Sequence, residues 1–119
     1  MIESSCHCGA VSLQIDGVIG DVTDCNCSIC RRYGALWAYF SPRLVQVVPP
    51  VGVTDIYMCG NKWLEFHRCK ICGSVTHWSP VDKSVDRMGV NARLLHPAQL
   101  AQARIRRFDG ADTWKSLDD

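Results

Sequence analysis

The chain has 119 residues, of which thirteen are Lys or Arg and twelve are Asp or Glu, giving a formal net charge of +1. A chain of this length has room for one core, and we expect a single domain over residues 1–119. The basic residues are scattered and 47% of the residues are hydrophobic. This composition excludes a disordered chain and a membrane-spanning one, and it gives no reason to expect nucleic acid as a partner.

Short segments with strand patterns follow one another along the chain. Residues 11–16 alternate apolar and polar side chains and end before Gly17, which predicts a strand with one wet face. Further segments are rich in β-branched or aromatic residues and are separated by Pro, Gly or Asn, a spacing typical of an all-β fold. These predicted strands cover residues 35–40, 44–48, 53–58, 62–67, 74–79 and 86–90.

The remaining elements are a break, a helix and a charged strand. Pro49 and Pro50 cannot continue a central strand. Residues 97–103 predict one short helix near the C-terminus, with Pro97 at or near its first position. Residues 104–107 read Arg-Ile-Arg-Arg, which looks like a strand with one charged face.

The N-terminus bears on the redox environment of the thiols. No basic segment and no apolar run precedes the first cysteines, so we expect no secretion signal and a cytoplasmic location. In a reducing compartment thiols persist as metal ligands or reactive groups more readily than as disulfides.

The eight cysteines fall into three clusters and one single residue. Cys69 and Cys72, followed by Gly73, have the spacing of a zinc knuckle, in which a tight turn aims two sulfurs at one metal. Structural zinc takes four protein ligands, so Cys6 and Cys8 are the natural complement of this pair. Such a site would connect the amino terminus to the middle of the chain.

The middle cluster contains Cys25, Cys27 and Cys30. These residues are close enough in sequence to bind one ion from a strand end and the turn after it. Catalytic zinc sites keep one coordination position for water or substrate, whereas structural sites are closed. A three-plus-four division therefore predicts two zinc ions per chain, one structural and one catalytic.

Spacing leaves other assignments open. Cys25 and Cys27 can instead pair with Cys69 and Cys72, and the set with the N-terminal pair can form two disulfides or buried free thiols. Cys59, a histidine or an aspartate can also close the middle site and make both metals structural. By itself, Cys59 is expected to be a small, half-buried apolar residue.

Two histidines and three tryptophans are weaker candidates for a role at the metal sites. His67 and His77 lie near the last cysteine pair and are candidates for outer partners of the ligands. Trp37, Trp63 and Trp114 are expected to serve in core or surface packing.

The cysteine motifs, in this order, resemble the glutathione-dependent formaldehyde-activating enzymes and their relatives, which include centromere protein V. The resemblance covers most of the chain, through residues 6–11, 25–34, 69–74 and 89–95. The chain is similar to a short, compact branch of the family. It implies a β-tent of small antiparallel sheets stapled by two zinc ions. It also implies that the first and last cysteine pairs share the structural ion and that the middle cluster holds the catalytic one.

The resemblance further implies the condensation of glutathione with formaldehyde, a carbon–sulfur lyase reaction. Our first hypothesis is an enzyme in which zinc on Cys25, Cys27 and Cys30 activates a small-molecule thiol for addition to a small aldehyde. Arg31 and Arg32 follow directly and are candidates for binding a substrate carboxylate. An equally good interpretation is a solvated pair that balances the sulfur charge.

Two rival hypotheses come from other classes of protein. The first is a non-enzymatic, zinc-stapled binding module in which both metals are structural, and a fourth protein ligand at the middle cluster would favour it. The second is redox work by Cys59 or the middle cluster. Residues 104–107 are too small a basic cluster to predict nucleic-acid binding.

Overall fold

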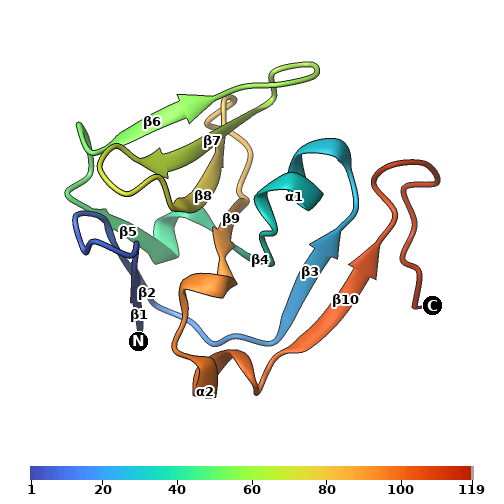
Figure 1. Ribbon diagram of the computed structural model, residues 1–119, viewed down its shortest axis with the longest axis horizontal. Helices are drawn as coiled ribbons and strands as arrows, with labels where there is room; N and C mark the ends of the chain where they lie inside the picture. Colours follow the sequence, from blue (N-terminus) through green and yellow to red (C-terminus); the bar gives the residue numbers. More distant parts are fainter. Residues whose placement is uncertain (119) are drawn as a thin grey trace.

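The computed structural model describes residues 1–118, and its strands form two sheets (Figure 1). The smaller sheet has the strand order β1-β2-β5 and the larger has the order β10-β3-β4-β9-β8-β7-β6. The predicted all-β class is confirmed. The strands are β1 (Ile2–Ser5), β2 (Ser12–Ile15), β3 (Asp21–Cys25), β4 (Trp37–Phe40), β5 (Val45–Val48), β6 (Thr54–Tyr57), β7 (Leu64–Cys69), β8 (Val75–Pro80), β9 (Met88–Asn91) and β10 (Arg104–Phe108); the helical elements are α1 (Ser28–Tyr33), η1 (Pro42–Leu44), η2 (Ala92–Leu94) and α2 (Pro97–Leu100).

The predicted elements recur with small shifts. Each of the eight predicted strands, residues 104–107 included, overlaps an observed one and differs from it by at most two residues at either end. Strand β5 ends at Val48, directly before the two prolines. The predicted helix is present but spans only Pro97–Leu100. Strands β1 and β3 and helix α1 were not predicted. In residues 1–118 we find no helix with the length and apolar character needed to cross a membrane.

One face of the seven-stranded sheet packs against the three-stranded sheet. Leu13 and Ile15 of β2 form a buried cluster with Met88 and Val90 of β9, and each is at most 5% exposed. Ala38 of β4 is paired with Val90 and extends this packed face. Full burial of one such large side chain contributes about 1.5–3 kcal/mol, so this contact holds the two sheets together.

The opposite face of the large sheet carries an aromatic cluster. Side chains alternate along a strand, so Trp37 points to the side away from Ala38. Trp37, Phe66 and Trp78 come from three strands and are each at most 8% exposed. Helix α1 and the end of β3 pack on this face, because their side chains belong to the same cluster.

Strand β10 lies at the edge of the large sheet and runs parallel to β3, with Phe108 opposite Cys25. The resemblance implied small antiparallel sheets, and this pairing differs from that expectation. Parallel neighbours need a crossover connection, and here β10 is reached through η2 and α2 (Figure 1). The chain that follows β10 consequently begins beside Cys25.

Candidate metal centres

Four cysteines that are far apart in sequence lie together in the structure. The Sγ atoms of Cys6, Cys8, Cys69 and Cys72, here called the cysteine quartet, are all within 4.8 Å of one another. All eight cysteines are free, so the alternative of two disulfides is wrong for this structure. The alternative that paired the middle cluster with Cys69 and Cys72 is also not what the structure shows.

Two similar turns aim these sulfurs. Gly73 has a φ of +76°, and its N–H donates to the Cys69 carbonyl at 3.0 Å. Gly9 has a φ of +82° and makes the corresponding bond to the Cys6 carbonyl at 3.2 Å. Such positive φ values favour glycine. The Cys6 turn joins β1 to β2 and the Cys69 turn joins β7 to β8, so the quartet connects the two sheets.

The donor set of the quartet fits zinc. Cys8 Sγ is 3.7 Å from both Cys6 Sγ and Cys69 Sγ, which is close to the ~3.8 Å edge of a tetrahedron whose ligands lie about 2.3 Å from the ion. Backbone N–H groups of Val11 and Ile71 donate to Cys6 Sγ and Cys69 Sγ at 3.3 and 3.4 Å. The backbone N–H groups of Cys72 and Ile71 lower the pKa of the Cys69 thiol, and the thiolate is the form that binds a metal.

A hydroxyl group adds to this effect at the fourth sulfur. The Ser74 hydroxyl, whose Oγ is 3.3 Å from Cys72 Sγ, is the largest cause that lowers the pKa of the Cys72 thiol to about 5, together with the backbone N–H groups of Cys8 and Ser74. Four thiolates this close repel one another unless a cation lies among them. The quartet is therefore a group of soft ligands able to hold one metal ion.

The second cluster is built where β3 passes into α1. Cys25 is the last residue of β3, Cys27 caps the N-terminus of α1, and Cys30 lies within the helix. Their Sγ atoms, here called the cysteine trio, lie within 4.8 Å of one another. The Cys30 N–H donates to Cys27 Sγ at 3.5 Å, and Gly34, with a φ of +65°, ends the helix by donating to the Cys30 carbonyl. The sequence analysis expected the trio at a strand end and the turn after it but gave the strand no range; in the structure the strand is β3 and the turn continues into helix α1.

The trio lies against the aromatic face of the sheet. The indole N–H of Trp37 donates to Cys30 Sγ at 3.3 Å, and both residues are buried. The Cys30 thiol donates a hydrogen bond that lowers the pKa of Cys25 to about 6, and this same bond, with burial, raises the pKa of Cys30. Without a metal, Cys25 thus loses its proton more readily than Cys30. A bound cation would stabilise all three as thiolates.

No fourth metal-ligating side chain joins the trio among residues 1–118: the cluster of His, Cys, Asp and Glu atoms found there contains only its three cysteines. Cys59 is half-buried, as predicted, and packs at the margin of the aromatic cluster outside both cysteine groups. His67 and His77 stack on each other with ring centroids 4.1 Å apart. Their ring nitrogens lie within hydrogen-bond distance of the hydroxyls of Thr54, Ser79 and Thr76 and have no cysteine partner.

The two arginines proposed for substrate binding follow the trio on the last turn of α1. Both are exposed. Arg32 Nη1 donates to the Ser28 carbonyl at 2.9 Å, within its own helix. No contact in the structure tests a role in substrate binding, so Arg31 and Arg32 stay a prediction.

Three residues beside the trio were given no role at the site from the sequence. Asn26 Nδ2 donates to Asp109 Oδ1 at 3.0 Å, although the two are 83 positions apart. Gly110 lies so close that a Cβ there would be 2.6 Å from Cys25 Sγ. Two local signals were available: Asn26 stands between two ligands, and Asp109 with Gly110 forms a dipeptide typical of turns.

Taken together, the fold and the two clusters define a β protein with one four-cysteine and one three-cysteine group able to hold metal ions. The chain belongs to the family described as glutathione-dependent formaldehyde-activating enzyme, which matches residues 1–109. It is also similar to a Rhodobacter sphaeroides protein whose crystal structure was a structural genomics target, with 29% sequence identity and a TM-score of 0.72. That alignment covers 87% of this chain and 99% of the other. The comparison with curated proteins gave no match.

Proposed function

We propose that this protein is a zinc-dependent enzyme of the carbon–sulfur lyase type that adds a glutathione-like thiol to a small aldehyde such as formaldehyde. Family membership supports the reaction class. The observation that carries the proposal is the three-cysteine group that stands apart from the four-cysteine group. Structural zinc sites are closed by four protein ligands, whereas catalytic sites have three and remain open to substrate.

In this proposal the chain binds two zinc ions with different roles. Cys6, Cys8, Cys69 and Cys72 would hold a structural ion between the sheets, and Cys25, Cys27 and Cys30 would hold a catalytic one. A zinc ion at the trio would supply one kind of chemistry, the stabilisation of a substrate thiol as thiolate at neutral pH. The proposed unit is a single domain that works in the cytoplasm.

The reaction forms one carbon–sulfur bond. The thiol sulfur adds to the aldehyde carbon, the carbon–oxygen π bond breaks, and the thiol proton ends on the former aldehyde oxygen. Around the trio, Trp37 donates to Cys30 Sγ and excludes water with its buried ring. Arg31 and Arg32 lie next to the trio in sequence and are proposed to bind a carboxylate of the thiol substrate, for which Arg32 would exchange its bond to Ser28.

The test is the rate at which the zinc-loaded protein forms S-hydroxymethylglutathione from glutathione and formaldehyde above the spontaneous rate. Cys27→Ser is expected to lose this acceleration, and Cys59→Ser, outside both clusters, is expected to keep it. Replacing both arginines by Ala is expected to raise the KM for glutathione and to leave the reaction with an uncharged thiol unchanged. Two bound zinc ions without any acceleration would contradict the proposal and favour a binding module with two structural metals.

A further inference from the structure

The chain after β10 folds back toward the cysteine trio. We call residues 109–118 the C-terminal turn. Its starting point is fixed by the parallel pairing of β10 with β3, in which Phe108 lies opposite Cys25 and its carbonyl accepts from the Asn26 N–H at 3.2 Å. The family match ends at residue 109, so the place of this segment comes from the structure alone.

The side-chain amide of Asn26 binds the start of the C-terminal turn through both its nitrogen and its oxygen. Its Nδ2 donates to Asp109 Oδ1 and its Oδ1 accepts from the Ala111 N–H, each at 3.0 Å. The other Asp109 oxygen accepts from the Thr113 N–H and hydroxyl at 3.2 and 2.9 Å. The side chain between two trio cysteines thus fixes the residues on both sides of Gly110.

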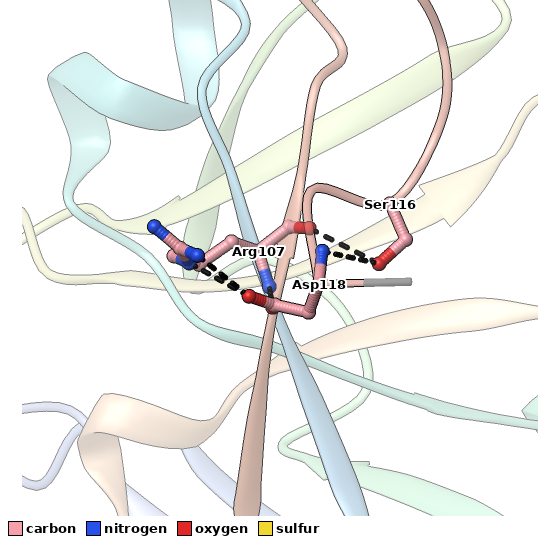
Figure 2. A network of polar contacts seen from close by, with 3 residues as sticks. All are labelled: Arg107, Ser116 and Asp118. Atoms are coloured by element: carbon pink, nitrogen blue, oxygen red, sulfur yellow. Dashed lines mark hydrogen bonds and ion pairs between the residues drawn. The ribbon is translucent and has the colours of Figure 1, made fainter.

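The far end of the turn returns to β10, as Figure 2 shows around Arg107, Ser116 and Asp118. Asp118 Oδ1 accepts from Arg107 Nε and Nη2 at 2.9 and 2.7 Å, and its Oδ2 accepts from the Arg107 N–H at 2.7 Å. Ser116 pairs with Phe108, and the Leu117 N–H donates to the Arg107 carbonyl at 2.8 Å. An exposed ion pair alone contributes little, but these bonds together close the turn at its base.

Gly110, between the two held ends, packs directly on the trio. A Cβ built there would lie 2.6 Å from Cys25 Sγ, closer than packed atoms come, and 3.2 Å from Cys27 Cβ, a tight contact. Its φ lies outside the left-handed region, so the glycine is needed for space and not for backbone conformation. Cys25 can relieve such a clash only by rotating its sulfur away from the trio, or the turn must leave Asn26.

We propose that the C-terminal turn is a wall of the trio site, and that Asn26 and Gly110 are positioning residues that keep the Cys25 and Cys27 sulfurs where they bind a metal together. Residues that orient metal ligands typically change metal affinity by about 10–100-fold when replaced. The inference rests on the proposed function in one respect, the assignment of a metal to the trio.

The test compares two glycine variants of the full chain loaded with zinc. Gly110→Ala places a methyl group against Cys25, whereas Gly20→Ala places one where no atom lies within 4 Å. Each protein is challenged with a chelator, and the protection of each cysteine from alkylation is followed by peptide mass spectrometry. In Gly110→Ala the trio is expected to lose its metal at chelator concentrations at least about tenfold lower, with the quartet unchanged. Gly20→Ala is expected to match the wild type.

A second pair of variants acts without adding atoms near the trio. Asn26→Ala and Asp109→Ala each remove the bond that fixes the turn, and each is expected to weaken metal binding at the trio. Each variant also removes bonds of its own, to Ala111 in the first case and to Thr113 in the second. Because the Asn26–Asp109 bond is lost in either single variant, the double variant is expected to lose less than the sum of the two single losses. Unchanged trio protection in Gly110→Ala, or fully additive losses in the double variant, would overturn the inference.

The same measurements separate this inference from the proposed function. A wild type that binds metal at the trio but does not accelerate thiol addition would defeat the proposed enzyme and leave the positioning role standing. Trio metal that is equally well held in Gly110→Ala would defeat the positioning role, whatever the activity.

Discussion

The ring of His77 is 4% exposed and lies flat against His67, with 11° between the ring planes. Its Nδ1 is 2.8 Å from Thr76 Oγ1. Burial, with the neighbouring His67 as a smaller cause, lowers the pKa of His77 from 6.5 to about 3. The folded protein therefore keeps this ring neutral under conditions in which the unfolded chain protonates it.

This difference predicts that His77 lowers stability in acid. Between about pH 6.5 and about pH 3 the unfolded state binds one proton more at this ring, so stability is fully present above that range and falls as the pH decreases. His77→Phe keeps a flat ring and lacks the proton site, while Thr76 keeps its bond to the His67 carbonyl. Urea denaturation from about pH 7 to about pH 5 is expected to show a weaker pH dependence for the variant, by at most about 1.4 kcal/mol per pH unit. Equal slopes for the two proteins would contradict the effect.

At the scale of elements, β9 is shaped by a glycine between two aromatic side chains. Gly89 is paired with Tyr39 on one side and Trp78 on the other, and these two rings lie with centroids 6.0 Å apart. A Cβ on Gly89 would be 2.1 Å from Trp78 Nε1. The Trp78 ring can occupy this place only because β9 has no side chain there.

Gly89→Ala is therefore expected to lower the free energy of unfolding by about 1–3 kcal/mol through overpacking. In a Trp78→Phe background the same substitution should cost less, because the smaller ring leaves room for a methyl group. Gly20→Ala, in open space, should stay within about 0.5 kcal/mol of the wild type. Denaturant titrations of the four proteins in the cycle, with Gly20→Ala as control, measure this; an equal cost of Gly89→Ala in both backgrounds would show that Trp78 is not the cause.

The elements also show which parts of the fold are readable in the sequence. Strands with local alternation between turn residues were predicted, such as β2 and β8. Strand β3 (Asp21–Cys25) was missed because it carries two acidic residues in five, and its pairing partners β4 and β10 supply what the local pattern lacks. Helix α1 has six residues, too few to repeat a helical period, and its ends are set by Cys27 and Gly34.

The candidate sites follow the same division. The quartet and the trio could be predicted by counting, because metal ligands come in closely spaced groups. The contact of Asn26 with Asp109 could not be predicted, since it depends on the register of β10 beside β3, and parallel pairing leaves no hairpin turn in the sequence. The grouping of the ligands was readable from local sequence, whereas strand β3, helix α1 and the segment that packs on the trio were not.

At the scale of the whole molecule, the two clusters occupy different structural positions. The quartet joins the turn after β1 in the small sheet to the turn after β7 in the large sheet. The trio lies on the aromatic face of the large sheet, which is the face opposite the small sheet. All its ligands come from the six residues 25–30, at the end of β3 and the start of α1. With zinc at both, loss of the quartet ion would remove a link between the two sheets, whereas loss of the trio ion would change one face of the large sheet.

Cys69→Ser and Cys27→Ser are consequently expected to differ in kind. Structural zinc contributes apparent free energies of about 10–16 kcal/mol in small zinc domains, as much as the whole stability of a typical domain. Cys69→Ser should therefore abolish cooperative unfolding, measured by near-UV circular dichroism during heating. Cys27→Ser leaves both the quartet and the buried contact of β2 with β9 in place, so it should unfold cooperatively with one zinc ion bound instead of two. Cys59→Ser, outside both groups, controls for the loss of a thiol as such and should retain both ions. If the Cys27 and Cys69 variants were equally unfolded, the trio would have a structural role like that of the quartet, and the division of labour between the two metals would be wrong.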